Sequence, residues 1–440
     1  MAFNKLVDYL KRDAELYPEK TAAIAGNEKI TYKELYARVL ERSTRFKKGE
    51  VVAFRSSQDI EFLITYFAIH QAGAIAAPLE KDIPESRFKE ISEMISSSSI
   101  PEEVADILFT TGTTGKSKGV MISHRTIVSN GENLIEGQLF SHNLLFIING
   151  PMNHIGSLSK IFPTTMLGST IYFLEGMKDL DLFFQALDYP ADKVATFFVP
   201  ATIRMLLQFS EERLASYKNK IDFIESGAAP LPHSDMLKLC EVLPNTRLYN
   251  TYASTETGII STYNFNDGRC TPGCLGKPMS HSKVIITDEG KISCKGDTLM
   301  TGYVNDPLLT ATILRDNTIF TSDLGVLDEE GMLHIKGRES DVINVGGFKV
   351  APTEVEDVAM SIPEVKDCIC ISVEHKITGR ALKLLVVLKE GETLNKQRIA
   401  RFLKEKLEAY KVPMLYEQVD SVKRTYNGKM DRKYYMNNNQ

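Results

Sequence analysis

The chain contains few cysteines, and none of them form a metal-binding pattern. Its six cysteines are scattered along the second half of the sequence and include no Cys-x-x-Cys pair, which excludes the usual zinc ribbon and redox pair. Cys270 and Cys274 have a zinc-compatible spacing, but neither a second pair nor a nearby His pair completes four ligands. We therefore expect ordinary thiols in a reducing compartment.

The sequence also lacks long apolar runs, repeats and an excess of positive charge. No segment approaches the roughly 18 apolar residues of a membrane span, and no apolar signal core follows the first residues. Lysine and arginine number 52 against 57 acidic residues, for a net charge of −5. These features predict a cytoplasmic protein with no membrane span, and they argue against a non-specific nucleic-acid binder.

Apolar runs of strand length alternate with helical segments through most of the chain. Residues 51–79 read as strand, apolar helix and strand, a βαβ unit that implies a parallel sheet. Thr31 and Glu34 predict a capping box at the start of a helix. Further strands are predicted at LLFIING, STIYFL, ATFFVP, KIDFIESG and RLYNTYAS, and hairpins after about residue 283.

The polar segment GRESD separates these elements from a C-terminal region of different pattern. Beyond it, apolar strands and a helix from about Lys396 to Ala409, capped by Asn395, suggest a compact α+β unit. The predicted fold is α/β, with a large multi-sheet N-terminal domain at 1–339 and a small α+β C-terminal domain at 340–440.

The densest chemical signal is TTGTTGKSKG at 110–119, directly after an apolar strand. Glycines let backbone amides approach an anion, threonine hydroxyls donate to phosphate oxygens, and Lys118 adds charge. The ending resembles a Walker A loop, but Thr110 occupies the position where that pattern requires glycine. The following VMIS reads as a strand, and Ser123 is the first plausible helix cap. The pattern thus favours a strand–loop–strand phosphate loop over a P-loop kinase or a merely solvated hairpin.

This loop resembles the nucleotide-phosphate loop of the acyl-adenylate-forming superfamily, and further motifs of that family follow in order. On these motifs the chain is identified as a short member of the superfamily, most like its acyl-CoA synthetases. The matching segments are PMNHIG (151–156), SGAAPLP (226–232), YASTETG (252–258), TSDLG (321–325), GRESDVINVGGFKVAPTEVE (337–356) and NGKMDR (427–432).

The resemblance implies an ATP- and Mg²⁺-dependent carboxylate–CoA ligase. A carboxylate would attack the α-phosphorus of ATP to give an acyl-adenylate and pyrophosphate, and CoA would then take the acyl group, releasing AMP. The family rotates its C-terminal domain between these two steps, and a hinge at GRESD fits that motion. ATP, Mg²⁺ and CoA are thus the expected cofactors, with a small carboxylic acid as substrate.

The resemblance also assigns roles to individual residues. Lys429 is expected to stabilise the adenylation transition state, Thr255 to contact the α-phosphate, Glu256 to bind Mg²⁺, and Asp323 with Arg338 to hold the ribose. The remaining expected contacts are Thr110, Thr111, Gly112, Thr113, Thr114, Gly115 and Lys118 for the phosphates; Gly227, Ala228, Ala229, Asn250 and Tyr252 for the nucleoside; Gly346 and Gly347 for pantetheine; and His154, Ala201, Thr251 and Ala253 for the acid.

The sequence departs from the family pattern in several places. Ala253 replaces a glycine and narrows the predicted acyl pocket, and Ser322 replaces another without affecting Asp323. Ser340 stands where the family usually has its hinge Asp or Lys. Only residues 81–109 separate the strand ending at APLE from the phosphate loop, a shorter connection than in most relatives.

Two alternatives to a CoA ligase stay open. One is a ligase that loads the phosphopantetheine of a carrier protein, and the other is a degenerate nucleotide-binding protein. The sequence does not define the acid, although the reduced size is similar to that of o-succinylbenzoate–CoA ligases. A homodimer is compatible with the sequence.

Overall fold

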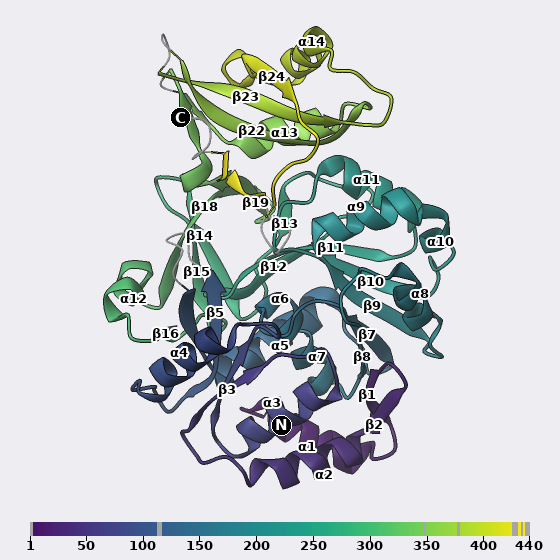
Figure 1. Cartoon of the computed structure of the whole chain (residues 1–440), viewed down its shortest axis with the longest axis vertical. Helices are drawn as coiled ribbons and strands as arrows, with labels where there is room; N and C mark the ends of the chain where they lie inside the picture. The colour runs from purple at the N-terminus through teal and green to yellow at the C-terminus, as the bar shows by residue number, and fades with distance from the viewer. Residues whose placement is uncertain are drawn as a thin grey trace.

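The computed structural model describes residues 3–111, 117–346, 348–375, 379–424, 430–432, 434 and 435, with backbone alone at 111, 117 and 379. It has a large mixed α/β N-terminal domain and a small C-terminal domain, drawn below and above in Figure 1. The predicted fold class is therefore confirmed.

A large mixed sheet forms the centre of the N-terminal domain. Its strand order is β12-β11-β10-β9-β7-β8-β1-β2. The strands from β11 to β1 run parallel, and the antiparallel strands β12 and β2 form the two edges. The strands are β1 (Thr21–Ala25), β2 (Glu28–Thr31), β7 (Leu144–Ile148), β8 (Thr170–Phe173), β9 (Lys193–Phe198), β10 (Ile221–Ser226), β11 (Arg247–Ser254) and β12 (Gly258–Asn264).

A second sheet contains the two strands that flank the predicted phosphate loop. Its order is β16-β6-β5-β4-β3, and β5 and β6 form an antiparallel hairpin in which Thr110 faces Lys118. The strands are β3 (Val51–Arg55), β4 (Ile75–Leu79), β5 (Val104–Thr111), β6 (Ser117–Ser123) and β16 (Gly302–Tyr303). The predicted βαβ unit is confirmed, since β3 and β4 are parallel and α3 (Ile60–Gln71) connects them. The predicted strand–loop–strand is confirmed too, because α5 begins only after Ser123, whose side chain caps it.

Helices fill the space between the two sheets and cover their outer faces. Helix α5 (His124–Gln138) contacts both β12 and the β5–β6 hairpin, so it joins the sheets. The capping box of Thr31 and Glu34 is present at the start of α2. The other helices of this domain are α1 (Leu6–Leu16), α2 (Tyr32–Ser43), α4 (Glu85–Ser96), α6 (Ile155–Leu158), α7 (Ile161–Met166), α8 (Leu180–Asp188), α9 (Pro200–Phe209), α10 (Glu211–Ala215), α11 (His233–Val242) and α12 (Pro307–Ile313).

A third sheet is built from the hairpins predicted after residue 283. Its order is β13-β19-β18-β15-β14, with β17 paired to β18. The strands are β13 (Cys274–Gly276), β14 (Ser282–Ile286), β15 (Lys291–Gly296), β17 (Leu314–Arg315), β18 (Thr318–Leu327) and β19 (Leu333–Arg338). Asp323 and Arg338 are cross-strand partners in this sheet, which fixes two predicted ribose contacts side by side.

The C-terminal region has a hydrophobic core of its own, to which Val355, Leu384 and Leu403 contribute. The polar segment GRESD contains a single 3-10 turn, η1 (Glu339–Asp341). Asn395 caps α14 as predicted, but the helix ends at Lys406, and η2 (Ala409–Lys411) follows. The other elements are β20 (Ile343–Val345), β21 (Phe348–Val350), α13 (Pro352–Met360), β22 (Val365–His375), β23 (Gly379–Leu388) and β24 (Leu415–Gln418).

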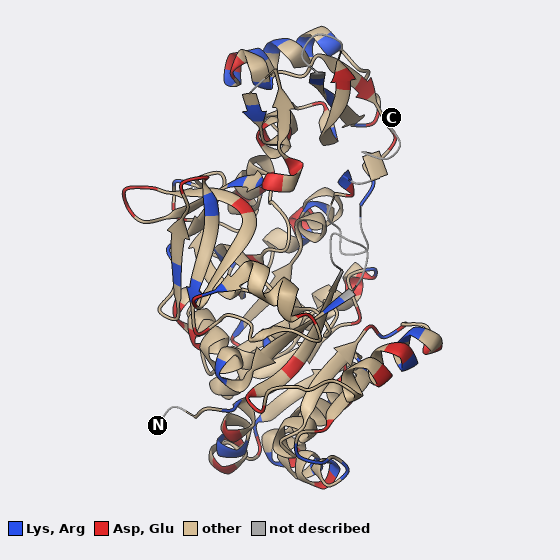
Figure 2. Ribbon diagram, turned by 90° about the vertical axis from the view of Figure 1, so that its left-hand side faces the viewer, with Lys and Arg blue, Asp and Glu red and all other residues tan. Residues whose placement is uncertain are grey.

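Two further features are the length of the helices and the distribution of charge. Within the described ranges, no helix is long and apolar enough to cross a membrane. Basic and acidic residues are interspersed over both domains in Figure 2 rather than gathered on one side.

Candidate active site

Four of the predicted site segments lie at the carboxyl ends of neighbouring parallel strands in the large sheet. Parallel strands β7, β9, β10 and β11 all end there. They lead in turn into the Pro-x-x-His segment (151–156), the start of α9, the SGAAP loop (226–230) and the glutamate motif (252–258), which begins within β11. Ligands of open α/β sheets characteristically bind outside these carboxyl ends. The topology therefore gathers motifs that are up to a hundred residues apart in sequence.

Three residues predicted to bind nucleoside form one hydrogen-bonded cluster. The Tyr252 hydroxyl donates to Asp323 Oδ2 at 2.8 Å, and Arg338 Nε donates to Asp323 Oδ1 at 2.9 Å. Burial, and then the Asp323 carboxylate, raises the pKa of Tyr252 well above its ordinary value, which keeps the phenol as a donor. Asp323 is thus an oriented carboxylate next to an exposed guanidinium: the carboxylate can accept hydrogen bonds from ribose hydroxyls, and the guanidinium can donate to them.

The SGAAP loop approaches its neighbours closely and contains a strained residue. A side chain at Gly227 would come within 3.3 Å of the Thr251 carbonyl oxygen, so the loop backbone lies against β11. Ala228 has φ of 68°, a left-handed conformation that disfavours a β-carbon, and its side chain is exposed. Such strain at a loop facing a site is typical of residues held for function. Ala229, next in the loop, is half-buried.

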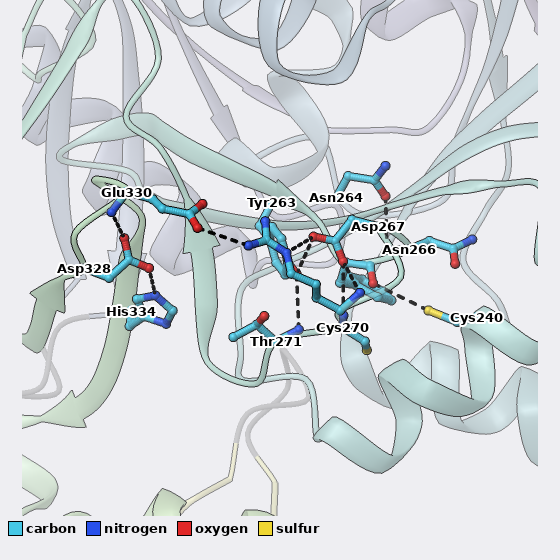
Figure 3. A network of polar contacts seen from close by, with 12 residues as sticks. Cys240, Tyr263, Asn264, Asn266, Asp267, Cys270, Thr271, Asp328, Glu330 and His334 are labelled. Atoms are coloured by element: carbon cyan, nitrogen blue, oxygen red, sulfur yellow. Dashed lines mark hydrogen bonds and ion pairs between the residues drawn. The ribbon is translucent and has the colours of Figure 1, made fainter.

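A polar network fixes the segment beside Asn250, whose side-chain amide donates to the Cys274 carbonyl at 3.4 Å. In Figure 3, Asp267 accepts from the Tyr263 hydroxyl and the Cys270 amide, and the Thr271 amide donates to Tyr263. This turn leads directly into β13. Asn250 therefore contacts a segment whose position is set by several hydrogen bonds.

The metal-ligand candidate Glu256 has a partner that sequence reasoning missed. The Tyr303 hydroxyl donates to Glu256 Oε1 at 2.9 Å, and the ammonium of Lys118 lies 5.5 Å from the centre of the Tyr303 ring. Burial and the Glu256 carboxylate raise the pKa of Tyr303, so it stays a donor. The structure thus brings Lys118 and Glu256 to one place through Tyr303, on β16, while Thr255 is half-buried beside them.

Glu256 fits a magnesium ion that arrives with a nucleotide. The described part of the chain contains no group of three or more His, Cys, Asp or Glu side chains that could hold a metal alone. Mg²⁺ commonly takes one or two carboxylates and completes its shell with substrate phosphates and water. One half-buried carboxylate, joined through Tyr303 to Lys118 of the predicted phosphate loop, meets that requirement.

The phosphate-loop predictions fall partly outside the described residues. Thr110 lies at the end of β5, and Thr111 is described by its backbone alone. Gly112, Thr113, Thr114 and Gly115 lie outside the described residues, as do Gly347 and Lys429. Gly346 is described and has φ of 58°, the left-handed region that glycine tolerates best.

Two of the predicted acid contacts, Thr251 and Ala253, lie on the face of the large sheet that looks toward α5. His154 precedes α6 and Thr251 is buried in β11, where it accepts a hydrogen bond from Gln138 of α5. Ala253 is half-buried near the end of β11, whereas Ala201 is exposed in the first turn of α9.

A buried ion pair lies on this same face and was not predicted. Lys160 Nζ is 2.5 Å from Glu225 Oε2, and the two side chains are 0% and 1% exposed. The one sequence feature that could have indicated this pair is the charged residue Glu225, which lies in an apolar strand just before the SGAAP loop.

Comparisons with known proteins identify the family of the chain. The sequence matches the family model for AMP-binding enzymes over residues 10–100 and 89–304, and that for the AMP-binding enzyme C-terminal domain over 354–429. The chain belongs to the AMP-binding enzyme family. It is accordingly an enzyme of the acid–thiol ligase type, as the motifs predict.

Named relatives and solved structures extend the match over most of the chain. A 2-succinylbenzoate–CoA ligase of Bacillus cereus (strain AH820) is 29% identical over 92% of this chain and 93% of its own. A long-chain-fatty-acid–CoA ligase of Bacillus subtilis (strain 168) is 30% identical over 75% of this chain and 61% of its own. The crystal structure of ATP-bound MatB from Rhodopseudomonas palustris has a TM-score of 0.85 and 25% identity, covering 99% of this chain and 98% of that one.

Proposed function

We propose that this member of the family is an ATP- and Mg²⁺-dependent carboxylate–CoA ligase that works through an acyl-adenylate. The observation that carries the proposal is the pair of clusters beside the same strand ends: Tyr252, Asp323 and Arg338 on one, and Lys118, Tyr303 and Glu256 on the other. They have the chemistry needed for a ribose and for a metal-bound polyphosphate.

In the proposed adenylation step, the residues of this chain orient ATP and neutralise its charge. Asp323 and Arg338 hold the ribose, the SGAAP loop and Asn250 contact the base, and Glu256 holds Mg²⁺, which neutralises phosphate charge when bound. Thr255 donates to the α-phosphate, and Thr110 to Gly115 with Lys118 hold the phosphates that leave. Lys429 balances the charge that develops as the carboxylate attacks phosphorus.

For thioester formation we place a hinge at GRESD, with the domain boundary between 339 and 340. Rotation there would withdraw Lys429 and present Gly346 and Gly347 to the pantetheine arm. Phe348, next in this hairpin, is 55% exposed and stacks on Tyr410 with ring centres 4.6 Å apart. Transfer to a carrier-protein phosphopantetheine is the second candidate, since the same hairpin would meet the same thiol arm.

The test is hydroxylamine-trapped pyrophosphate release with ATP and Mg²⁺, without CoA, over a panel of aliphatic, aryl, dicarboxylic and amino acids. We expect release with at least one acid and none when the acid or ATP is left out. Adding free CoA should then yield the acyl-CoA; a thioester formed only with a carrier protein would favour the second candidate. ATP binding without pyrophosphate release from any acid would favour a degenerate nucleotide-binding protein instead.

A further inference from the structure

The buried Lys160–Glu225 pair lies close to two segments that contain or contact predicted acid-binding residues. Lys160 follows α6, and Glu225 pairs in parallel register with Phe197 of β9. The Lys160 ammonium lies 5.2 Å from the centre of the Phe197 ring. The far edge of that ring is 3.4 Å from the positions where Gly156 and Gly227 would carry a β-carbon. The half-buried Phe197 ring therefore lies against the ammonium, against the segment that carries the predicted acid contact His154, and against the SGAAP loop, which packs on the predicted acid contact Thr251.

Stability alone does not account for this pair. Removing two charges from water is costly, and replacing a buried ion pair with apolar residues of similar volume is often neutral or stabilising. The neighbouring position on the same face of β10 is occupied by the fully buried Phe223, so an apolar side chain is accepted on this face. An apolar side chain at position 225 would therefore have an apolar neighbour on the same face.

The pair also has unused hydrogen-bonding capacity. An ammonium has three N–H donors. Beyond the contact between the two charges, neither Lys160 Nζ nor Glu225 Oε2 makes a hydrogen bond with any other described group. Buried polar atoms of this kind call for an explanation, because most are satisfied in native proteins. Donors left over beside a proposed pocket suit an acceptor on the ligand.

We propose that Lys160, held in place by Glu225, is the specificity-determining end of the acid pocket. It selects acids that carry an acceptor oxygen, a second carboxylate or a ketone, at the end remote from the reacting carboxylate. Reaching the ammonium requires the Phe197 side chain to turn aside, a rotamer change of the kind that commonly accompanies binding. This inference rests on the proposed function for the identity of the pocket.

The selectivity between acids follows from the charged or polar groups of the protein that each acid would leave without a hydrogen-bond partner. An acid ending in oxygen accepts from the Lys160 ammonium, whereas an apolar acid of equal length displaces Phe197 and leaves a buried charge without a new partner. Sites built to hydrogen-bond a substrate group reject analogues lacking it by large factors.

The experiment compares matched acids on wild type and on the double variant Lys160→Met/Glu225→Leu. The pairs are adipate against hexanoate and 2-succinylbenzoate against 4-phenylbutanoate, with affinities measured calorimetrically beside a non-hydrolysable ATP analogue. We expect wild type to bind the oxygen-bearing member at least about tenfold more tightly. The double variant should lose or reverse that ratio while its affinity for the ATP analogue is unchanged. The surface ion-pair variant Arg38→Met/Glu61→Leu, in α2 and α3, should keep the wild-type ratio.

A second variant keeps the test independent of how well the double variant folds. Phe197→Ala removes the ring and retains the pair, so it should tighten binding of longer oxygen-bearing acids and not of their apolar counterparts. The inference is overturned if wild type prefers the apolar members, binds neither member, or if either variant leaves the ratio unchanged. Pyrophosphate release tests the proposed function separately. Adenylation of apolar acids alone would support the proposed function and reject this inference. The predicted binding ratio without pyrophosphate release would support this inference and reject the proposed function.

Discussion

At the scale of single residues, Asp323 joins the glutamate motif to the third sheet. Its two oxygens accept from Tyr252 and Arg338, which come from β11 and β19. We expect Asp323→Asn to lower kcat/KM for ATP about 10- to 100-fold, because hydrogen bonds to a charged group contribute about 1.5–3 kcal/mol. The loss should appear mainly as a higher KM for ATP, measured by steady-state pyrophosphate release. Tyr252→Phe, which keeps the carboxylate, should cost less; an equal loss would contradict a direct ribose contact by Asp323.

Glu256 and Tyr303 form a matched pair for testing the metal role. Glu256→Gln removes the anionic ligand, so we expect the Mg²⁺ concentration for half-maximal activity to rise by about tenfold or more. Tyr303→Phe removes only the hydrogen bond to Oε1 and should raise it less, since it acts by orienting the carboxylate. Titrating Mg²⁺ at saturating ATP measures both. An unchanged titration for Glu256→Gln would remove it from the metal role.

Sequence motifs could indicate the cluster of Tyr252, Asp323 and Arg338, because each residue belongs to a recognisable local pattern. Tyr303 and the Lys160–Glu225 pair could not be found in this way. Tyr303 reaches Glu256 across 47 residues, and Lys160 meets Glu225 only through the packing of a turn on a sheet face. Such contacts depend on strand order, which local patterns do not contain.

At the scale of elements, helix α1 contains a buried carboxyl group, Asp13, whose raised pKa can be tested through the stability of the protein. The Asp13 side chain is fully buried, and burial raises its pKa to about 6 although Arg12 beside it acts in the opposite direction. The folded chain holds the Asp13 proton more tightly than the unfolded chain does. The protonated Asp13 therefore makes its full contribution to the free energy of unfolding below about pH 4. This contribution is lost as the pH rises through about 6.

We therefore expect wild type to lose about 3 kcal/mol of stability relative to Asp13→Asn between pH 4 and pH 7. Urea denaturation at intervals of one pH unit, followed on the transition of the N-terminal domain, measures the difference. Glu15→Gln, at an exposed position of the same helix, serves as the control and should show no such trend. A constant difference between wild type and Asp13→Asn would contradict the raised pKa.

Elements with local signals could be predicted well from the sequence. The capping box at Thr31, the cap at Ser123 and the hairpins of the third sheet all depend on residues a few positions apart. The predicted end of α14 was three residues too late, because the chain leaves the helix after Lys406 and continues as a 3-10 turn after Glu408. The order of the strands in the large sheet could not be predicted, since it is set by packing between distant segments.

At the scale of the whole molecule, Asp367 connects the two domains. It accepts from Arg204 of α9 at 3.2 Å and from Arg424 at 2.7 Å, and Arg204 also pairs with Asp235 of α11 at 3.1 Å. Arg424 directly precedes the segment 425–429 that ends in Lys429. The same carboxylate thus docks the C-terminal domain on α9 and anchors the start of the segment proposed to supply the adenylation lysine.

This shared anchor predicts that the domain arrangement described here favours adenylation. We expect Arg204→Met to slow acyl-adenylate formation about tenfold, the effect of 1.4 kcal/mol, with little change in thioester formation from pre-made acyl-adenylate. Lys429→Ala should abolish the first step and also spare the second, which calibrates the two assays. Measuring the rates of the two half-reactions separately tests whether this arrangement of the domains favours adenylation. If Arg204→Met slowed both steps equally, the ion pair would be a structural contact common to both arrangements, and Asp367 would not distinguish them.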